Sequence, residues 1–237
     1  FGAGVLVGPR AVFAEGDPFL AGGGAVDLVD LDEVTWTDPP DREEAGSPNV
    51  VGAVALHAAI AEVGRIGWDA IIDHDTRLHG RLRSGLATIP GVVVLGPDAA
   101  VPALPLATFT LSGTPHALVA ARLSAEHGIG VRHGCFCAHP YLVRLLGLDP
   151  DDIARYWDAV RHHDRRHTPG AIRASAGVST TEDDIDRLVA AVADIASGPP
   201  APVAYHQDPH TGDFRVEDGV AGWLAGDRAV GASCARG

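Results

Sequence analysis

The sequence predicts an α/β sandwich with a small mixed sheet over residues 65–198. Short apolar runs bounded by glycine alternate there with longer segments whose apolar residues recur at helical spacing. This alternation is typical of one sheet covered by helices, and about 130 residues is an ordinary domain size. Residues 1–64 show no comparable core, so we expect them to form the end of another domain plus a connecting helix. Residues 199–237 follow as a tail with a possible small hairpin.

The first 64 residues contain two expected elements. Glycine punctuates an apolar run over residues 1–12, which predicts a strand region. Asn49 can cap a helix over residues 50–64, and Gly64 is expected to end it. Apolar residues lie on most faces of this helix, which predicts that it is buried.

The expected elements of the α/β domain follow from caps and periodicity. Asp69 begins a helix that places Leu78, Leu82 and Leu86 on one face. A capping residue at Thr180 or Thr181 begins the last helix, which Gly198 ends. Between these two helices we expect strands at residues 91–96, 106–111, 129–132 and 171–175, and helices at residues 115–126, 141–146 and 149–163.

Composition excludes several classes of function. The formal net charge is −13 over 237 residues, and a chain this acidic repels phosphate backbones and anionic lipid, so we expect neither nucleic-acid nor membrane partners. No apolar run approaches the roughly 20 residues that span a bilayer, and no signal peptide opens the chain. Three cysteines form no disulfide framework, which favours a reducing, cytoplasmic compartment.

The sequence contains no lysine, because all 18 basic residues are arginine. A lysine amine is the group that forms a Schiff base with a carbonyl cofactor or substrate. Nothing in this chain can therefore supply that amine.

The segment from His133 to His139 holds the most unusual cluster of side chains. Four metal-capable residues lie within seven positions, His133, Cys135, Cys137 and His139. A Cys-x-Cys pair in a strand would point its thiols to opposite faces, and no second cysteine pair is near, so we predict no metal site. Cys135 is expected to be a small buried residue. Cys137, before a Pro-started helix and near Arg132, is expected to be a reactive thiol.

Two further features carry functional hypotheses. Arg173 lies in an apolar strand, where it needs either a structural ion pair or a carboxylate ligand to bind with its planar fork; Arg132 leaves the same two alternatives. Gly46 and Ser47 precede an apolar helix, where free amides and a hydroxyl could bind an anion or could form an ordinary cap.

Taken in order, these motifs resemble one family. The chain contains, in this order, FGAGVLVG, EAGSPN, GVRHGCFCAHP and RASAGVSTTEDDIDRLVAAV. This order resembles the C-terminal half of class V, fold-type I enzymes that depend on pyridoxal phosphate (PLP). Within that class the chain is most similar to the cysteine desulfurase and selenocysteine lyase group. The resemblance covers about residues 1–198. It implies the small C-terminal domain of a fold-type I enzyme, preceded by the end of the large PLP-binding domain.

The resemblance also implies roles for single residues. Cys137 corresponds to the catalytic cysteine that takes sulfur as a persulfide, and Arg173 to the arginine that binds the substrate α-carboxylate. Arg132 corresponds to a second arginine close to the active site. Gly46 and Ser47 correspond to a Gly-Thr-Pro-Asn turn whose hydroxyl reaches the cofactor phosphate of the neighbouring subunit.

The resemblance further implies a homodimer with shared active sites, a small amino-acid substrate and a sulfur-acceptor protein. The PLP lysine of the family would precede a segment like FGAGVLVG, so it is expected outside this chain, and the chain alone is expected to be inactive. The bridge over residues 149–170 is longer than in the family. Two alternatives stay open: a class V aminotransferase, epimerase or lyase acting on another amino acid, and a metal-binding or interaction module built on the HGCFCAH loop.

Overall fold

The computed structural model describes residues 2–97, 101, 103–198 and 200–217. The chain divides into two compact units, Phe1–Ala70 and Ile71–Gly237. The predicted domain boundaries at residues 64 and 198 stay a prediction. No single described helix is both long enough and apolar enough to cross a membrane. Among the described residues, only the bent pair of helices Val50–Ile66 and Trp68–Ala87 meets both criteria when counted together.

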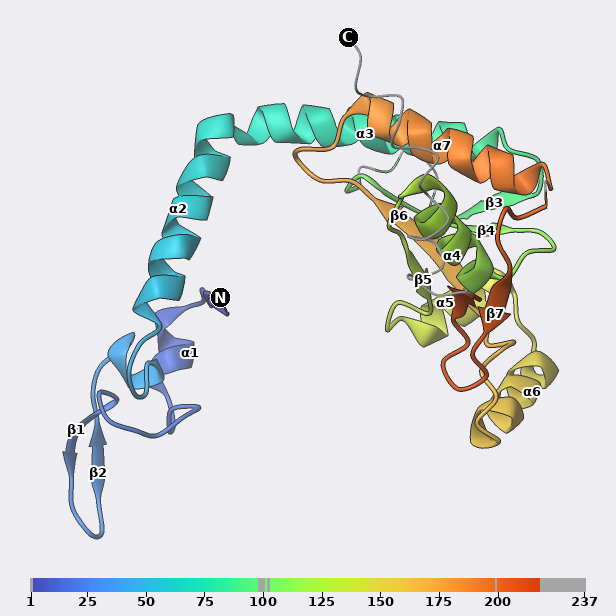
Figure 1. Ribbon diagram of the computed structural model, residues 1–237. Coiled ribbons are helices and arrows are strands. Elements are labelled where there is room, and N and C mark those ends of the chain that lie inside the picture. Colours follow the sequence, from blue (N-terminus) through green and yellow to red (C-terminus); the bar gives the residue numbers. More distant parts are fainter. Residues whose placement is uncertain (1, 98–100, 102, 199, 218–237) are drawn as a thin grey trace. The chain divides into compact units, whose positions relative to one another are not determined.

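The first unit consists of short elements and one long helix (Figure 1). In chain order these are α1 (Arg10–Ala14), β1 (Val26–Val29), β2 (Val34–Trp36), a 3-10 turn (Asp41–Glu43) and α2 (Val50–Ile66). The strands pair antiparallel. The expected strand region at residues 1–12 is wrong, because the described residues 2–12 belong to no strand pair and the chain turns into α1 after Pro9.

The described residues of the first unit bury almost no apolar side chain. Ala25 is their only buried hydrophobic residue, and the guanidinium of the buried Arg42 donates to the backbone carbonyls of Ala14 and Gly16. Phe19 is 90% exposed and Leu31 is fully exposed. A unit of this size needs a larger core for independent stability.

Helix α2 begins as predicted, with the Asn49 side chain accepting from the Gly52 amide at 2.9 Å. It passes through Gly64 and ends at Gly67, which takes the positive φ of +94° that favours glycine. The prediction that α2 is buried is wrong for this chain, because Gly52 alone is buried. The apolar surface of α2 is therefore left uncovered by the described residues.

The second unit is one four-stranded sheet with helices on it. The sheet order is β3-β4-β6-β5, and each neighbouring pair is antiparallel, so that β4 and β5 run in the same direction on either side of β6. The elements are α3 (Trp68–Ala87), β3 (Val92–Leu95), β4 (Leu106–Leu111), α4 (His116–His127), β5 (Arg132–Gly134), α5 (His139–Leu146), α6 (Pro150–Arg161), β6 (Ala171–Ser175) and α7 (Glu182–Ala196). The predicted α/β class is confirmed.

One face of the sheet carries the hydrophobic core. The predicted helical stripe of α3 is buried there together with that of α7, and Figure 1 shows these two helices side by side. Val119 and Leu123 of α4 complete the core against Phe109 and Ile172 of the central strands. Burial alternates residue by residue along β4, which leaves its second face free for other contacts.

Two boundaries differ from the sequence prediction in an informative way. The strand expected at residues 129–132 lies at Arg132–Gly134, because Gly128 adopts a left-handed cap and the Ile129 amide donates to the Leu123 carbonyl at 2.9 Å. Residues 129–131 thus belong to the exit from α4. The last helix begins after Thr181, whose side chain forms a capping box with Asp184.

The tail forms the expected hairpin. Strand β7 (Tyr205–Gln207) pairs antiparallel with β8 (Phe214–Val216). Tyr205 donates its hydroxyl to Glu126 of α4 at 2.9 Å, which fixes the hairpin to the second unit. The end of the tail, including Cys234, lies outside the described residues.

Candidate active site

A row of polar side chains crosses the face of the sheet opposite the core. Arg173 of β6 lies directly between Thr108 of β4 and Arg132 of β5. Directly opposed residues of an antiparallel pair point to the same face. The two predicted arginines are therefore neighbours, although 41 positions separate them in the sequence.

Arg173 is half-buried without a carboxylate partner. Its guanidinium carbon lies 5.4 Å from the ring centre of Phe136, in a cation–π contact. Its Nε is buried and has no hydrogen-bond partner among the described residues. No ion pair forms at Arg132 or Arg173 in the described part of the chain. Two opposed cations with an unpaired donor suit an anionic ligand.

Cys137 lies on a strained turn beside Arg132. Phe136 and Cys137 have φ of +55° and +58°, which non-glycine residues rarely adopt and which are concentrated at functional sites. The Cys137 side chain is exposed, and Arg132 Nη2 lies 3.9 Å from its Sγ. The Arg132 guanidinium can therefore donate a hydrogen bond to this sulfur.

Cys135 occupies a different environment from Cys137. It packs against the small apolar cluster of Leu95, Leu142 and Ala171 that lies under α5. The expectation that alternation along a strand points the two thiols to opposite faces is wrong. Strand β5 ends at Gly134, and both cysteines lie in the turn that follows. The positive φ values, rather than a pleat, separate the two thiols.

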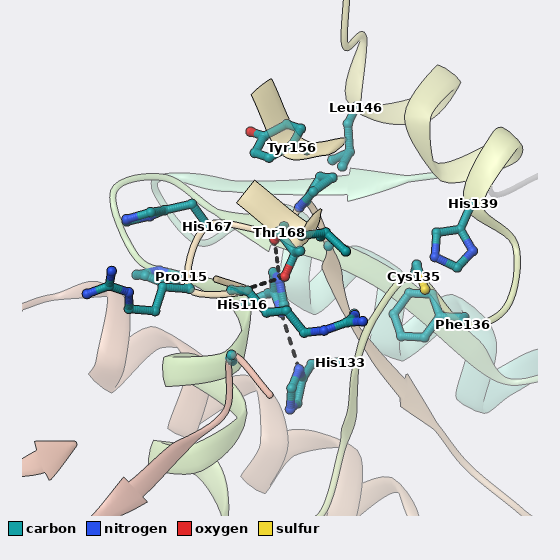
Figure 2. Close-up of a pocket in the computed structure, with 18 of the residues that line it drawn as sticks. Pro115, His116, His133, Cys135, Phe136, His139, Leu146, Tyr156, His167 and Thr168 are labelled. Carbon is teal, nitrogen blue, oxygen red and sulfur yellow. Dashed lines mark hydrogen bonds between the residues drawn. The ribbon is translucent and has the colours of Figure 1, made fainter. Parts of the chain in front are cut away.

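A cavity of about 850 Å³ opens on the same turn (Figure 2). It lies at the edge of the sheet where β4 and β5 end, between the cysteine turn, α5, α6, the loop at residues 165–170 and the turn of the β7–β8 hairpin. Arg132 and Cys137 line it, whereas Arg173 does not. Cys137 therefore faces this cavity as well as the arginine row.

The cavity contains a chain of polar groups that the sequence did not reveal. His116 Nδ1 lies 3.3 Å from His133 Nδ1, and His116 Nε2 lies 3.1 Å from the Thr168 carbonyl oxygen (Figure 2). His133 Nε2 lies 3.5 Å from Asp213. Burial is the main cause that lowers the pKa of His116; the Thr168 carbonyl opposes it and His133 adds to it. These residues come from four segments, so no local pattern could have identified them.

The described residues include no group of three or more His, Cys, Asp or Glu side chains that could hold a metal ion. His133 faces Asp213 and His116, while the side chains of Cys137 and His139 are exposed. The structure thus adds no observation in favour of the metal-binding alternative.

Gly46 and Ser47 lie in the first unit, immediately before α2. The Gly46 amide donates to the Gly23 carbonyl at 2.8 Å, and Gly46 has a φ of +86°, so it shapes the turn rather than offering a free amide. Ser47 is exposed at the N-terminus of a 17-residue helix, which fits the phosphate end of PLP. The aldehyde end does not fit, because the chain has no lysine.

Several known proteins are similar to this chain in sequence. A probable cysteine desulfurase from Halobacterium salinarum is 31% identical over 191 residues, which cover 81% of this chain and 40% of that protein. A cysteine desulfurase from Serratia proteamaculans is 32% identical over 190 residues, covering 80% and 41% of the two chains. The chain thus spans about 40% of the length of these relatives.

Solved structures give the same result. The cysteine desulfurase of Thermococcus onnurineus matches with a TM-score of 0.64 and 30% identity, over 77% of this chain and 40% of that one. A cysteine desulfurase from Escherichia coli matches with a TM-score of 0.60 and 29% identity, over 76% and 39%. The family model of class-V aminotransferases matches residues 1–188, so the chain belongs to the class-V aminotransferase family.

Proposed function

We propose that this chain forms the carboxylate-binding and thiol side of the active site in a PLP-dependent cysteine desulfurase. The observation that carries the proposal is the opposed pair Arg132 and Arg173, which has no carboxylate partner among the described residues and lies next to the exposed Cys137 on its strained turn. The similarity to proteins named cysteine desulfurase supports the same activity.

Each of these residues has a distinct role in the proposed reaction. Arg173 binds the α-carboxylate of L-cysteine, since its guanidinium can donate two parallel hydrogen bonds. Arg132 stabilises the Cys137 thiolate. That thiolate attacks the sulfur of the substrate; an S–S bond forms, the C–S bond breaks, and its electron pair stays with the three-carbon product, which takes a proton. When bound, PLP supplies the electron sink that makes such bond cleavage accessible.

The proposed reaction also needs a lysine, a neighbouring subunit and a sulfur acceptor. A lysine outside this chain supplies the amine for PLP, and Ser47 supplies a hydroxyl for the phosphate of the neighbouring subunit in a cytoplasmic homodimer. The persulfide on Cys137 then passes to an acceptor.

This assembly predicts that the 237-residue chain by itself is inactive. Mixed with PLP and cysteine, it should release sulfide from cysteine no faster than free PLP does. Steady sulfide release above that background would contradict the assembly.

The first test compares the two cysteines in the complete protein. Cys137→Ala should abolish sulfide release from L-cysteine while substrate binding stays nearly intact, because the thiol acts after binding. Cys135→Ala is the matched control and should be close to silent, since the Cys135 side chain is partly buried against the apolar cluster of Leu95, Leu142 and Ala171. If Cys135→Ala were inactive and Cys137→Ala active, Cys135 would be the catalytic cysteine instead.

The second test addresses the carboxylate. Arg173→Ala should weaken cysteine binding by roughly 2–5 kcal/mol, the range for removing one partner of a hydrogen-bonded charge pair. Arg173→Lys should restore only part of this, since an ammonium cannot reproduce the planar fork. Unchanged KM in both variants would assign the carboxylate to another residue.

The class V aminotransferase, epimerase or lyase alternative is tested with the same complete protein. If neither cysteine substitution changes the turnover rate and other amino acids are substrates, this alternative activity replaces the proposed desulfurase activity. A metal-binding module would instead retain stoichiometric zinc through dialysis and bind no PLP.

A further inference from the structure

The cavity beside Cys137 has two chemically different walls. Helices α5 and α6 supply the apolar wall, with Leu146, Ile153, Tyr156, Trp157 and Val160. The opposite wall is polar and contains Arg132, Arg165 and Arg166. A volume of about 850 Å³ is within the range of small-molecule sites. The walls suit a ligand with an apolar body and a charged end.

The charge of the polar wall is positive after its ion pairs are counted. Arg166 is neutralised by Asp164, with Nη2 2.7 Å from Oδ2, which leaves one carboxylate, Asp213, against the two remaining arginines of the lining. Arg165 and Arg132 have no carboxylate within ion-pair distance among the described residues. Two unpaired cations in a chain of net charge −13 indicate that the ligand is an anion.

Arg165 is held in place by the hairpin. Its backbone amide donates to the Pro209 carbonyl at 2.7 Å, and the Thr168 amide and hydroxyl both donate to its carbonyl, the hydroxyl at 2.7 Å. Asp213 on the same hairpin faces His133. The hairpin lies beyond residue 188, where the family match ends. The cavity wall thus includes a part of this chain that lies outside the family match.

We propose that this cavity binds the sulfur acceptor as a small anionic thiol, with its acid group at Arg165 and its thiol at Cys137. The inference rests on the proposed function, in which Cys137 carries a persulfide. The acceptor thiolate attacks the terminal sulfur, the S–S bond to Cys137 breaks, and Cys137 leaves as a thiolate beside Arg132. The acceptor gains the persulfide, and no external oxidant or reductant is needed.

The test uses thiol exchange on the whole chain and requires neither PLP nor cysteine. In a Cys135→Ala, Cys234→Ala background, Cys137 is converted to its mixed disulfide with neutral 2-thiopyridine. The added thiolate attacks the Cys137 sulfur and releases thiopyridone, whose absorbance gives the rate. The probes are anionic 3-mercaptopropionate and neutral 2-mercaptoethanol. The measured quantity is the ratio of their reaction rates. This ratio is compared between variants, because the intrinsic reactivity of the two thiols then cancels.

Arg165→Gln should lower the preference for the anionic thiol by up to roughly five-fold, the scale of an exposed charge pair. The matched control is the double variant Asp164→Asn, Arg166→Gln, which removes an ion pair without changing the net charge of the wall and should leave the preference unchanged. The side chains of Arg165 and Arg166 are exposed, so removing these guanidinium groups should not disturb folding. An unchanged ratio in Arg165→Gln, or equal losses in both variants, would overturn the proposal.

The experiments distinguish a failure of the proposed desulfurase function from a failure of the proposed thiol-binding cavity. If the complete protein releases no sulfide from cysteine but Arg165→Gln still lowers the thiol preference, the cavity binds anionic thiols and Cys137 is not the desulfurase thiol. If sulfide is released normally but the preference does not depend on Arg165, the acceptor is bound elsewhere, as a protein acceptor would be.

Discussion

At the scale of single residues, the two described cysteines differ in accessibility although one position separates them. Cys137 is exposed beside Arg132, whereas Cys135 packs under α5. We expect Cys137 to react with iodoacetamide at least about ten-fold faster than Cys135, because its side chain is exposed whereas that of Cys135 packs against an apolar cluster. Peptide mass spectrometry after timed quenching measures each rate separately. Equal rates would show that the turn does not hold the two thiols apart.

A buried ion pair makes the second prediction at this scale. Arg122 and Glu126 of α4 form two hydrogen bonds of 2.8 and 2.9 Å with side chains only 9% and 7% exposed. Glu126→Gln should lower the free energy of unfolding by about 3 kcal/mol, since it leaves a buried guanidinium without its counter-ion. Urea denaturation measures this. Asp186→Asn, which breaks the solvent-exposed pair with Arg81, should have a much smaller effect.

The same carboxylate predicts a pH dependence. Burial raises the pKa of Glu126, but hydrogen bonds from Arg122 and Tyr205 outweigh it, so the net shift is below the ordinary 4.5. A lowered pKa means that the unfolded chain binds more protons in this range. The contribution of Glu126 to stability should therefore be complete above pH 4.5 and decline as the pH falls below it. Glu126→Gln should flatten this decline; an identical slope would contradict the assignment.

At the scale of elements, the β7–β8 turn depends on a single glycine. Gly212 has a φ of +82°, and a Cβ there would lie 2.6 Å from the Arg165 carbonyl oxygen. Gly212→Ala should therefore cost clearly more than the roughly 1–2 kcal/mol of a left-handed alanine. Gly198→Ala is the matched control, because it has a φ of +79° and no atom near its Cβ position. Equal losses in thermal denaturation would show that the turn moves freely from Arg165.

At the scale of the whole molecule, the two units differ in how much apolar surface they bury. The second contains a continuous core around Phe109 and Ile172, while the first buries only Ala25 among its described apolar residues. Hydrogen exchange measured by mass spectrometry should find the slowest amides in β4 and β6 and fast exchange throughout residues 2–70, including α2. Protection of α2 equal to that of β4 in the monomeric chain would contradict this.

The sequence by itself determined most elements of the second unit and the start of the long helix of the first. Local signals were sufficient for β4 and β6, whose predicted bounds match those observed, and for the capped starts of α2 and α7, because caps, glycines and periodicity act within a few residues. The resemblance identified the family, and the class-V match over residues 1–188 confirms it. The roles of Cys137 and Arg173 stay predictions.

Only the tertiary structure decided which residues form the site. The opposition of Arg132 to Arg173 depends on the register of β5 with β6, and the contact of His116 with His133 and Thr168 joins segments that are distant in sequence. Such pairings are set by long-range packing, which leaves no local pattern. The exposure of α2 has the same origin: its apolar composition predicts burial, but burial requires a partner surface, and the described residues supply none.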